Sequence, residues 1–247
     1  MNTQTPHPND TPMLMVKGFA PLPTPAAPTA AQWLALGAVI GPVLFTLAWM
    51  ILGFLSPGYT AWGTRIAPYS PISQPISGLG LGITAPFMNT AFVFCGFLIL
   101  AGVIGIFQSL QEIGASARWR CILLLALVPL GMAVDGIFTL ESGFIHFVGF
   151  GLGAVVSPMV GFVVSGRVLR RITGFRRFGD WLVLGSPLTL ALMVLYFLTF
   201  TPTVAGTQSG VAGLTERILV VEILAWYVAL GWLVFRRTSR EASSGNS

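Results

Sequence analysis

From Trp33 to Phe235 the chain alternates long, uncharged apolar runs with short polar breaks. A helix needs about 20 apolar residues to cross the hydrocarbon core of a bilayer, and six of the runs are long enough. The runs are continuous and lack the alternation of a barrel strand, so they predict helices. The six predicted spans cover residues 33–55, 85–110, 119–140, 144–165, 181–201 and 215–235.

The composition agrees with a polytopic membrane protein. Charged residues make up 9% of the chain and hydrophobic residues 54%, with a mean hydropathy of +0.81. A soluble domain is usually about one quarter charged, so this class is excluded. The positive charge is also too sparse to follow a phosphate backbone, despite a pI near 9.9. We therefore expect no nucleic-acid partner; membrane lipids and a lipophilic small molecule are the expected partners.

The basic residues predict the orientation, because they hold loops on the cytoplasmic side of a membrane. If both termini are cytoplasmic, all of the 13 Lys and Arg residues except Arg65 and Arg217 fall on that side. The expected fold class is an all-α, six-span membrane helix bundle with cytoplasmic N- and C-termini. The bundle occupies residues 31–237. It follows a proline-rich tail at 1–30, which we expect to be disordered, and precedes a cytoplasmic tail at 238–247.

A second group of polar residues lies on the outer loops or in the outer parts of the spans, where insertion does not require them. Charged groups at membrane depth are costly, so they turn inward, pair or line a wet cavity. The sequence therefore predicts a polar pocket that opens to the outer face. Its catalytic candidates are Ser77, Asp135, His146 and Glu216, and its binding candidates are Arg65, Asn89, Arg217 and Glu222.

The chain connections bring some of these candidates together. Only Glu141–Gly143 separates the third span from the fourth, so these two helices should be antiparallel neighbours, with Asp135 and His146 at similar depth. The loop at 68–80 contains stiffening prolines and turn-forming glycines. Its apolar residues predict that it dips into the outer mouth of the bundle, which would point Ser77 toward the pocket.

Five short motifs carry a family resemblance. They are Pro75–Gly80, Asn89, Asp135–Gly136, His146 and Gly213–Arg217. In order and spacing they resemble the bacterial six-helix membrane proteins of domain-of-unknown-function 998, over roughly residues 33–235. The resemblance implies the six-span fold and a bacterial inner membrane, but no activity. One position departs from the family pattern, because Thr139 follows Phe138 where the family usually has proline, and this affects the turn between Asp135 and His146.

Three functions remain open for the pocket. An enzyme would use Ser77, His146 and Asp135 as nucleophile, base and orienting acid, or Asp135 and Glu216 as proton donors, on a lipid or isoprenoid substrate. A transporter or receptor would bind a small ligand or proton in the same pocket, with Glu222 as a deep relay. A structural protein would pair its buried acids with Arg217 or Arg65 and use Ser77 only as a helix cap.

Cofactor and metal sites are not expected. The spans contain no lysine for a Schiff base, and no P-loop or dinucleotide motif is present. A metal ion would have Asp135, His146 and Glu216 as its ligands. Zinc sites usually contain more histidine or cysteine ligands than the single histidine available here. The two cysteines, Cys95 and Cys121, lie in apolar runs, where a thiol packs as a small hydrophobe. The sequence does not indicate an oligomeric state.

Overall fold

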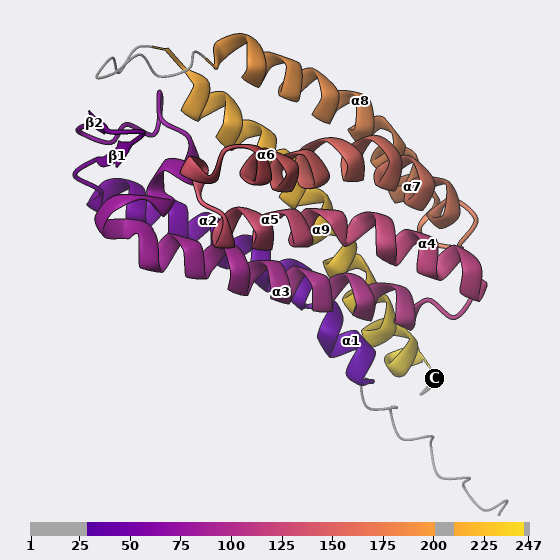
Figure 1. The fold of residues 1–247 in the computed structure, drawn as a ribbon. Coiled ribbons are helices and arrows are strands. Elements are labelled where there is room, and N and C mark those ends of the chain that lie inside the picture. The colour runs from indigo at the N-terminus through magenta and orange to yellow at the C-terminus, as the bar shows by residue number, and fades with distance from the viewer. Residues whose placement is uncertain (1–28, 201–209, 245–247) are drawn as a thin grey trace, which may run out of the picture.

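The computed structural model describes residues 29–200 and 210–244, with only the backbone described for 238–244. Almost all of the predicted N-terminal tail, and the end of the C-terminal tail, lie outside these residues. The helices run side by side in a bundle (Figure 1). They are α1 (Ala30–Ala35), α2 (Gly37–Leu55), α3 (Ala85–Ser109), α4 (Ala115–Leu125), α5 (Leu127–Ile137), α6 (Phe144–Phe150), α7 (Val163–Leu169), α8 (Arg176–Thr199) and α9 (Ala212–Ser244).

One π-helix and three 3-10 turns lie between the α-helices of the described chain. A π-helix, η4 (Gly151–Phe162), joins α6 to α7, and the 3-10 turns are η1 (Ile76–Gly80), η2 (Gly82–Thr84) and η3 (Leu140–Ser142). The η4 segment contains Pro158, which lacks a backbone N–H and cannot continue a regular hydrogen-bond ladder. Extended π-helix is rare in proteins and often marks a functional region.

Six helical segments of the described chain are long and apolar enough to cross a membrane. They are Ala30–Leu55, Gly82–Ser109, Ala115–Ile137, Phe144–Leu169, Arg176–Thr199 and Ala212–Arg237. Each lies within a few residues of a predicted span, so the prediction of six long apolar helices is confirmed, and they are consistent with a six-span membrane bundle. In lipid a helix satisfies its own backbone hydrogen bonds, which is why unbroken apolar runs take this form. The last helix continues to Ser244, into the segment expected to be a tail.

A small β-hairpin corrects the expectation of a purely helical chain. Strand β1 (Tyr59–Ala61) pairs in antiparallel register with β2 (Thr64–Ile66), and Tyr59 lies opposite Ile66. Trp62 and Gly63 form the turn, both with positive φ (47° and 77°). Two-residue turns of this kind match the twist of paired strands. Hydropathy alone missed the hairpin because the segment is too short to form a periodic pattern.

Close backbone packing holds neighbouring helices together. A Cβ at Gly102 of α3 would lie 2.1 Å from the backbone nitrogen of Ala38 in α2, and one at Gly131 of α5 would lie 2.4 Å from the carbonyl oxygen of Gly149 in α6. Neither contact leaves room for a side chain. Small residues at such crossings allow van der Waals packing between helices where hydrophobic burial supplies little driving force.

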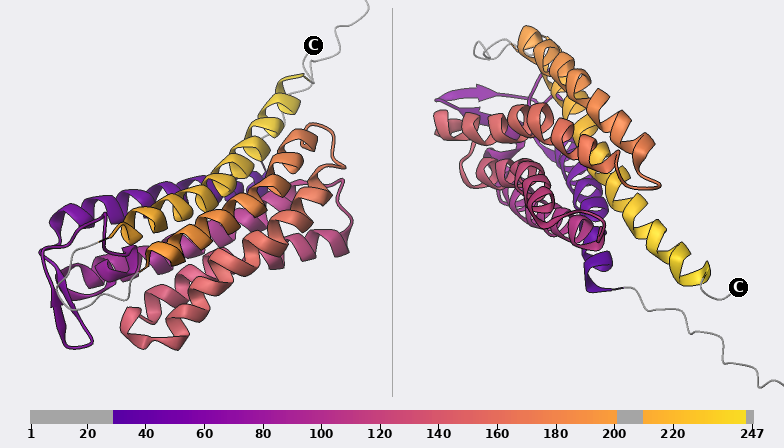
Figure 2. Two further views of the ribbon diagram at one scale, coloured as in Figure 1. Left: turned by 90° about the horizontal axis from the view of Figure 1, so that it is seen from above. Right: turned by 90° about the vertical axis from the view of Figure 1, so that its right-hand side faces the viewer.

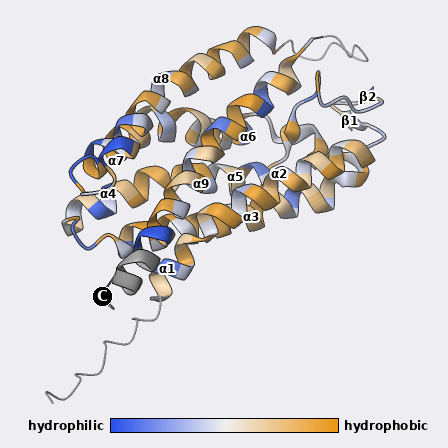
Figure 3. Cartoon of the chain, turned by 180° about the vertical axis from the view of Figure 1, so that it is seen from behind, coloured by the Kyte–Doolittle hydropathy of each residue, from blue (hydrophilic) through white to orange (hydrophobic). Residues whose placement is uncertain are grey.

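The two ends of the bundle differ. The hairpin lies at one end, called here the hairpin end, and both ends of the described chain lie at the opposite, terminal end (Figure 1), beyond which α9 extends (Figure 2). Most residues along the helices are hydrophobic, and many of the hydrophilic ones lie near the terminal end (Figure 3). The arginines of α4, of the segment from α7 to the start of α8, and of the last part of α9 (Arg236 and Arg237) belong to this end, which is the end expected to be cytoplasmic.

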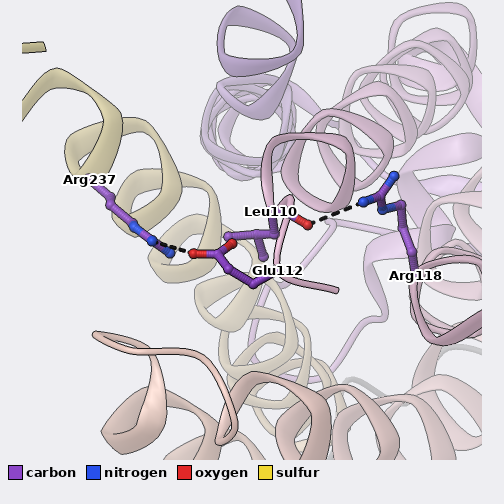
Figure 4. Close-up of polar contacts among 4 residues, drawn as sticks. All are labelled: Leu110, Glu112, Arg118 and Arg237. Atoms are coloured by element: carbon purple, nitrogen blue, oxygen red, sulfur yellow. Dashed lines mark hydrogen bonds and ion pairs between the residues drawn. The ribbon is translucent and has the colours of Figure 1, made fainter. Parts of the chain in front are cut away.

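At the terminal end, polar contacts join the α3–α4 loop to α9 and the end of α3 to α4. Glu112, in the loop between α3 and α4, forms an ion pair with Arg237 of α9, and Arg118 donates to the carbonyl oxygen of Leu110 at 3.4 Å (Figure 4). A hydrogen bond from its own backbone N–H and the Arg237 guanidinium hold the pKa of Glu112 below its usual value, against the effect of burial. The ion pair fastens the last helix to the α3–α4 loop, and the Arg118 hydrogen bond holds the start of α4 against the end of α3.

Candidate functional site

A cavity of about 70 Å³ lies among the helices near the hairpin end. Its walls come from α2, η1, α3, α5, α6, η4 and α9, and most of them are apolar. The apolar lining includes Phe45, Phe92, Met132, Phe150, Val220 and Leu224. The polar lining consists of Ser77, Asp135, His146 and Glu216. All four residues proposed as catalytic candidates from the sequence therefore face one cavity, although they lie up to 139 positions apart in the chain.

Asp135 of α5 and His146 of α6 contact each other in this cavity. His146 Nδ1 lies 3.5 Å from Asp135 Oδ1 and 2.9 Å from the carbonyl oxygen of Phe138. A carbonyl oxygen only accepts, so Nδ1 carries the hydrogen and donates it to Phe138. In the neutral ring Nε2 then keeps its lone pair and is the basic nitrogen. In the described chain Asp135 Oδ1 is buried and forms no hydrogen bond, which leaves it available to an imidazolium.

The turn between α5 and α6 makes this pairing possible. The chain leaves α5 at Phe138, passes through η3 and enters α6 after Gly143, whose φ is +56°. A glycine adopts this conformation without steric cost. Thr139, which stands where the resemblance led us to expect proline, does not separate Asp135 from His146. The carbonyl group of Phe138, which precedes Thr139, accepts the hydrogen of His146 Nδ1 and so fixes the orientation of the imidazole.

Gly149 provides the space for the Asp135 carboxylate. A Cβ at Gly149 would lie 2.3 Å from Asp135 Oδ1 and 2.9 Å from the carbonyl oxygen of Gly131. Any larger side chain would displace the carboxylate or separate α5 from α6. Gly149 is not among the site candidates predicted from the sequence. Its position one helical turn after His146 was a signal that it shares the face of α6 that carries the imidazole.

Glu216 of α9 positions the turn that carries Ser77. Glu216 Oε2 accepts a hydrogen bond of 2.6 Å from the backbone N–H of Ile76, the first residue of η1. Ser77 follows directly and is largely buried at the cavity wall. The predicted dip of the 68–80 loop into the bundle agrees with this geometry, since η1 is buried along its whole length.

Arg217 lies beside Glu216 on α9 but points into the loop and away from the cavity. Its Nη1 donates to the carbonyl oxygens of Pro71 (2.8 Å), Gln74 (2.9 Å) and Gly213 (2.7 Å), and its Nη2 donates to the Tyr69 hydroxyl. The guanidinium therefore fastens the loop to α9. The structure places this binding candidate among backbone acceptors, in a positioning role.

Aromatic residues surround this anchor. The guanidinium carbon of Arg217 lies 5.2 Å from the centre of the Trp49 ring, a cation–π distance. Burial raises the pKa of Tyr69 to about 12, although the Arg217 charge opposes the shift. Burial likewise raises the pKa of Tyr59, whose hydroxyl donates to Gln74 Oε1 at 2.7 Å. Sequence reasoning missed Tyr59, Tyr69 and Gln74 because their roles arise from contacts between distant segments.

The other three binding candidates also lie outside the cavity lining. Arg65 is exposed on β2. Asn89 of α3 donates from Nδ2 to the carbonyl oxygen of Gly80 at 3.2 Å and so supports the end of η1. Glu222 joins α8 to α9, where it accepts hydrogen bonds from Thr189 Oγ1 (2.8 Å) and Trp226 Nε1 (2.6 Å). Among the residues that the structure describes, no three His, Cys, Asp or Glu side chains are grouped to hold a metal ion.

Comparison with known proteins bears on the chain as a whole. The family model described as "Protein of unknown function (DUF998)" matches residues 39–233, which is most of the chain. The chain belongs to the DUF998 family. The resemblance inferred from the five motifs is thereby confirmed. No curated protein and no solved structure matches the chain.

In this DUF998 protein the cavity combines groups suited to proton transfer. It holds an imidazole with a free basic nitrogen, a carboxylate in contact with that imidazole, a hydroxyl group and a second carboxylate. The apolar walls lower the local dielectric, which strengthens the attraction between an imidazolium and Asp135. The site can therefore accept a proton from a hydroxyl group and hold the resulting charge.

Proposed function

We propose that this DUF998 protein is an intramembrane hydrolase that cleaves an ester bond in a lipophilic substrate. The observation that carries the proposal is the convergence of Ser77, His146 and Asp135, from three separate elements, on one apolar cavity. A hydroxyl, a base and an acid beside that base form the arrangement that recurs in serine hydrolases of unrelated folds. A position within the spanning helices favours a substrate drawn from the membrane.

Ser77, His146 and Asp135 each have a separate role in the proposed ester hydrolysis. The Ser77 oxygen attacks the ester carbonyl carbon while Nε2 of His146 takes the hydroxyl proton, and Asp135 stabilises the imidazolium. The imidazolium then gives this proton to the departing alcohol oxygen, which leaves an acyl group on Ser77. Water loses a proton to the same Nε2 and hydrolyses the acyl-serine bond. The products are a fatty acid and an alcohol, and Ser77 regains its hydroxyl proton.

Glu216 has a positioning role in this scheme. Its carboxylate holds the Ile76 N–H and so fixes the direction of η1, which sets where Ser77 lies. The volume of about 70 Å³ suits the reacting ester group and one or two waters, and it is small beside pockets that enclose a whole drug-sized ligand. The rest of a lipid substrate must therefore lie outside the cavity.

Ester hydrolysis by the purified protein in lipid nanodiscs tests the proposal. Fluorogenic long-chain acyl esters serve as substrates, and a fluorophosphonate serves as a covalent probe of an activated serine. We expect Ser77→Ala and His146→Gln each to lower kcat by at least about 10³-fold and to abolish labelling. Ser73→Ala is the matched control, because Ser73 lies in the same loop but does not line the cavity. Full turnover by a folded Ser77→Ala protein would refute the proposal.

Proton-coupled transport is the second candidate. It is favoured by the presence of both Asp135 and Glu216 in a cavity whose volume suits a few waters. Proteoliposomes with an internal pH dye test it, with Asp135→Asn and Glu216→Gln as variants. Transport predicts that a pH gradient collapses faster with wild-type protein than with either variant, in the absence of ester turnover.

A further inference from the structure

A second hollow lies on the lipid-facing surface between α2 and α9. It has a volume of about 420 Å³, and residues from Pro42 to Leu47 and from Val221 to Trp232 line it. Thr46 is the one lining residue with a hydroxyl, and the others are apolar. Both helices are candidate membrane spans, so hydrocarbon chains are the medium that surrounds this groove. The volume lies within the range of sites that bind small organic ligands.

The dimensions of the groove fit one hydrocarbon chain. Val221 and Trp232 are eleven residues apart, which corresponds to about 16 Å along a helix. Half of a hydrocarbon core about 30 Å thick is about 15 Å. The groove therefore has the length of an acyl chain in one leaflet of the bilayer.

The groove is adjacent to the catalytic cavity. Leu224 lines both hollows, and Phe45 lines the cavity while its neighbour Thr46 lines the groove. Leu224 is 3% exposed and Phe45 is 2% exposed, so these two side chains close the wall between the hollows. Glu216 lies two helical turns from Leu224 toward the hairpin end. A chain in the groove would therefore place the polar end of its lipid near the cavity.

We propose that the α2–α9 groove binds the acyl chain of the substrate lipid, and that Leu224 and Phe45 move to admit the ester group to the cavity. This inference rests on the proposed hydrolase function, for which it specifies the substrate as a lipid with a chain of about one leaflet length. The cavity holds the ester group, and the groove accommodates the part of the substrate that the cavity is too small to enclose.

A filled groove provides the first test. Ala225→Phe places a ring in the groove, and Ala191→Phe is the matched control, since Ala191 is an exposed alanine on α8 that lines neither hollow. Hydrolysis is measured on esters with butanoyl and hexadecanoyl chains. We expect Ala225→Phe to lower kcat/KM for the hexadecanoyl ester by about tenfold or more, because buried methylene contacts are lost, and to lower kcat/KM for the butanoyl ester much less, because its chain has few methylenes to lose. The control should retain wild-type kinetics on both.

Photo-crosslinking provides a readout that does not depend on turnover. Phosphatidylglycerol with a diazirine on its acyl chain is incorporated into the nanodiscs, and the labelled peptides are mapped by mass spectrometry. We expect enriched labelling at 42–47 and 221–232, which Ala225→Phe removes and Ala191→Phe preserves. This labelling without ester hydrolysis would support the groove and refute the hydrolase. Hydrolysis with no chain-length effect of Ala225→Phe and no enriched labelling would refute the groove alone.

Discussion

Replacement of Arg217 by methionine tests whether this one side chain holds the 68–80 loop in place. Methionine keeps much of the apolar stem and removes every hydrogen-bond donor. The change leaves the carbonyl oxygens of Pro71, Gln74 and Gly213 without their common partner. Removal of one member of a buried, charged hydrogen-bond network costs about 3 to 5 kcal/mol. We expect the free energy of local loop opening to fall by this amount.

Hydrogen–deuterium exchange of the loop amides measures this opening. The Gln74 N–H donates to the Ser70 carbonyl at 2.8 Å and the Gly78 N–H to the Pro75 carbonyl at 3.1 Å, so both amides report on an intact loop. At 1.4 kcal/mol per factor of ten, the two amides should exchange at least about 10²-fold faster in Arg217→Met than in the wild type. Exchange in the middle of the spanning helices should remain unchanged.

One further variant distinguishes the geometry of Arg217 from its charge, and a second serves as a control. Arg217→Lys keeps the charge but replaces the planar fork by a single ammonium group, so we expect an intermediate loss of protection. Arg65→Met is the matched control, since Arg65 is an exposed arginine on the neighbouring hairpin and should leave the loop protected. Equal protection of Gln74 in Arg217→Met and in the wild type would refute the anchoring role.

Three other changes have definite expected outcomes. Gly149→Ala should destabilise the protein by about 1 to 3 kcal/mol in denaturation assays and abolish ester turnover by displacing Asp135. Gly151→Ala should be tolerated, because its added Cβ meets no atom from outside its own stretch of helix within 4 Å. Burial raises the pKa of Tyr69 to about 12. The stability that the neutral Tyr69 hydroxyl contributes should therefore be complete below about pH 10 and be lost as the pH rises toward 12. Thermal unfolding of the wild type should show this loss of stability, and Tyr69→Phe should not show it. The pKa of Glu112 is lowered, so the stability that its ion pair contributes should be complete above about pH 4.5 and be lost as the pH falls below that value. The difference in unfolding midpoint between Glu112→Gln and the wild type should therefore be largest above about pH 4.5 and shrink on acidification.

The sequence by itself was sufficient to predict the spanning helices and the candidates for the site. Unbroken apolar runs must form helices in lipid, because a helix satisfies its own backbone hydrogen bonds, and the six runs coincide with the six helices found. The cost of charge at membrane depth was the reason to single out Asp135, His146 and Glu216. Ser77 was added from the predicted dip of its loop. These arguments use only local composition and position along one helix.

Only the tertiary structure decided which candidates share a cavity. Asp135 and His146 are brought together by a turn, and Ser77 is positioned by Glu216 across most of the length of the chain. Arg217, Asn89 and Glu222 resemble the cavity residues in type and depth, but they face the loop, η1 and α8 instead. The direction in which a side chain points depends on how its helix is rotated about the helix axis relative to the neighbouring helices. In lipid that rotation is set by close packing at glycines such as Gly149, and hydropathy along the chain does not record it.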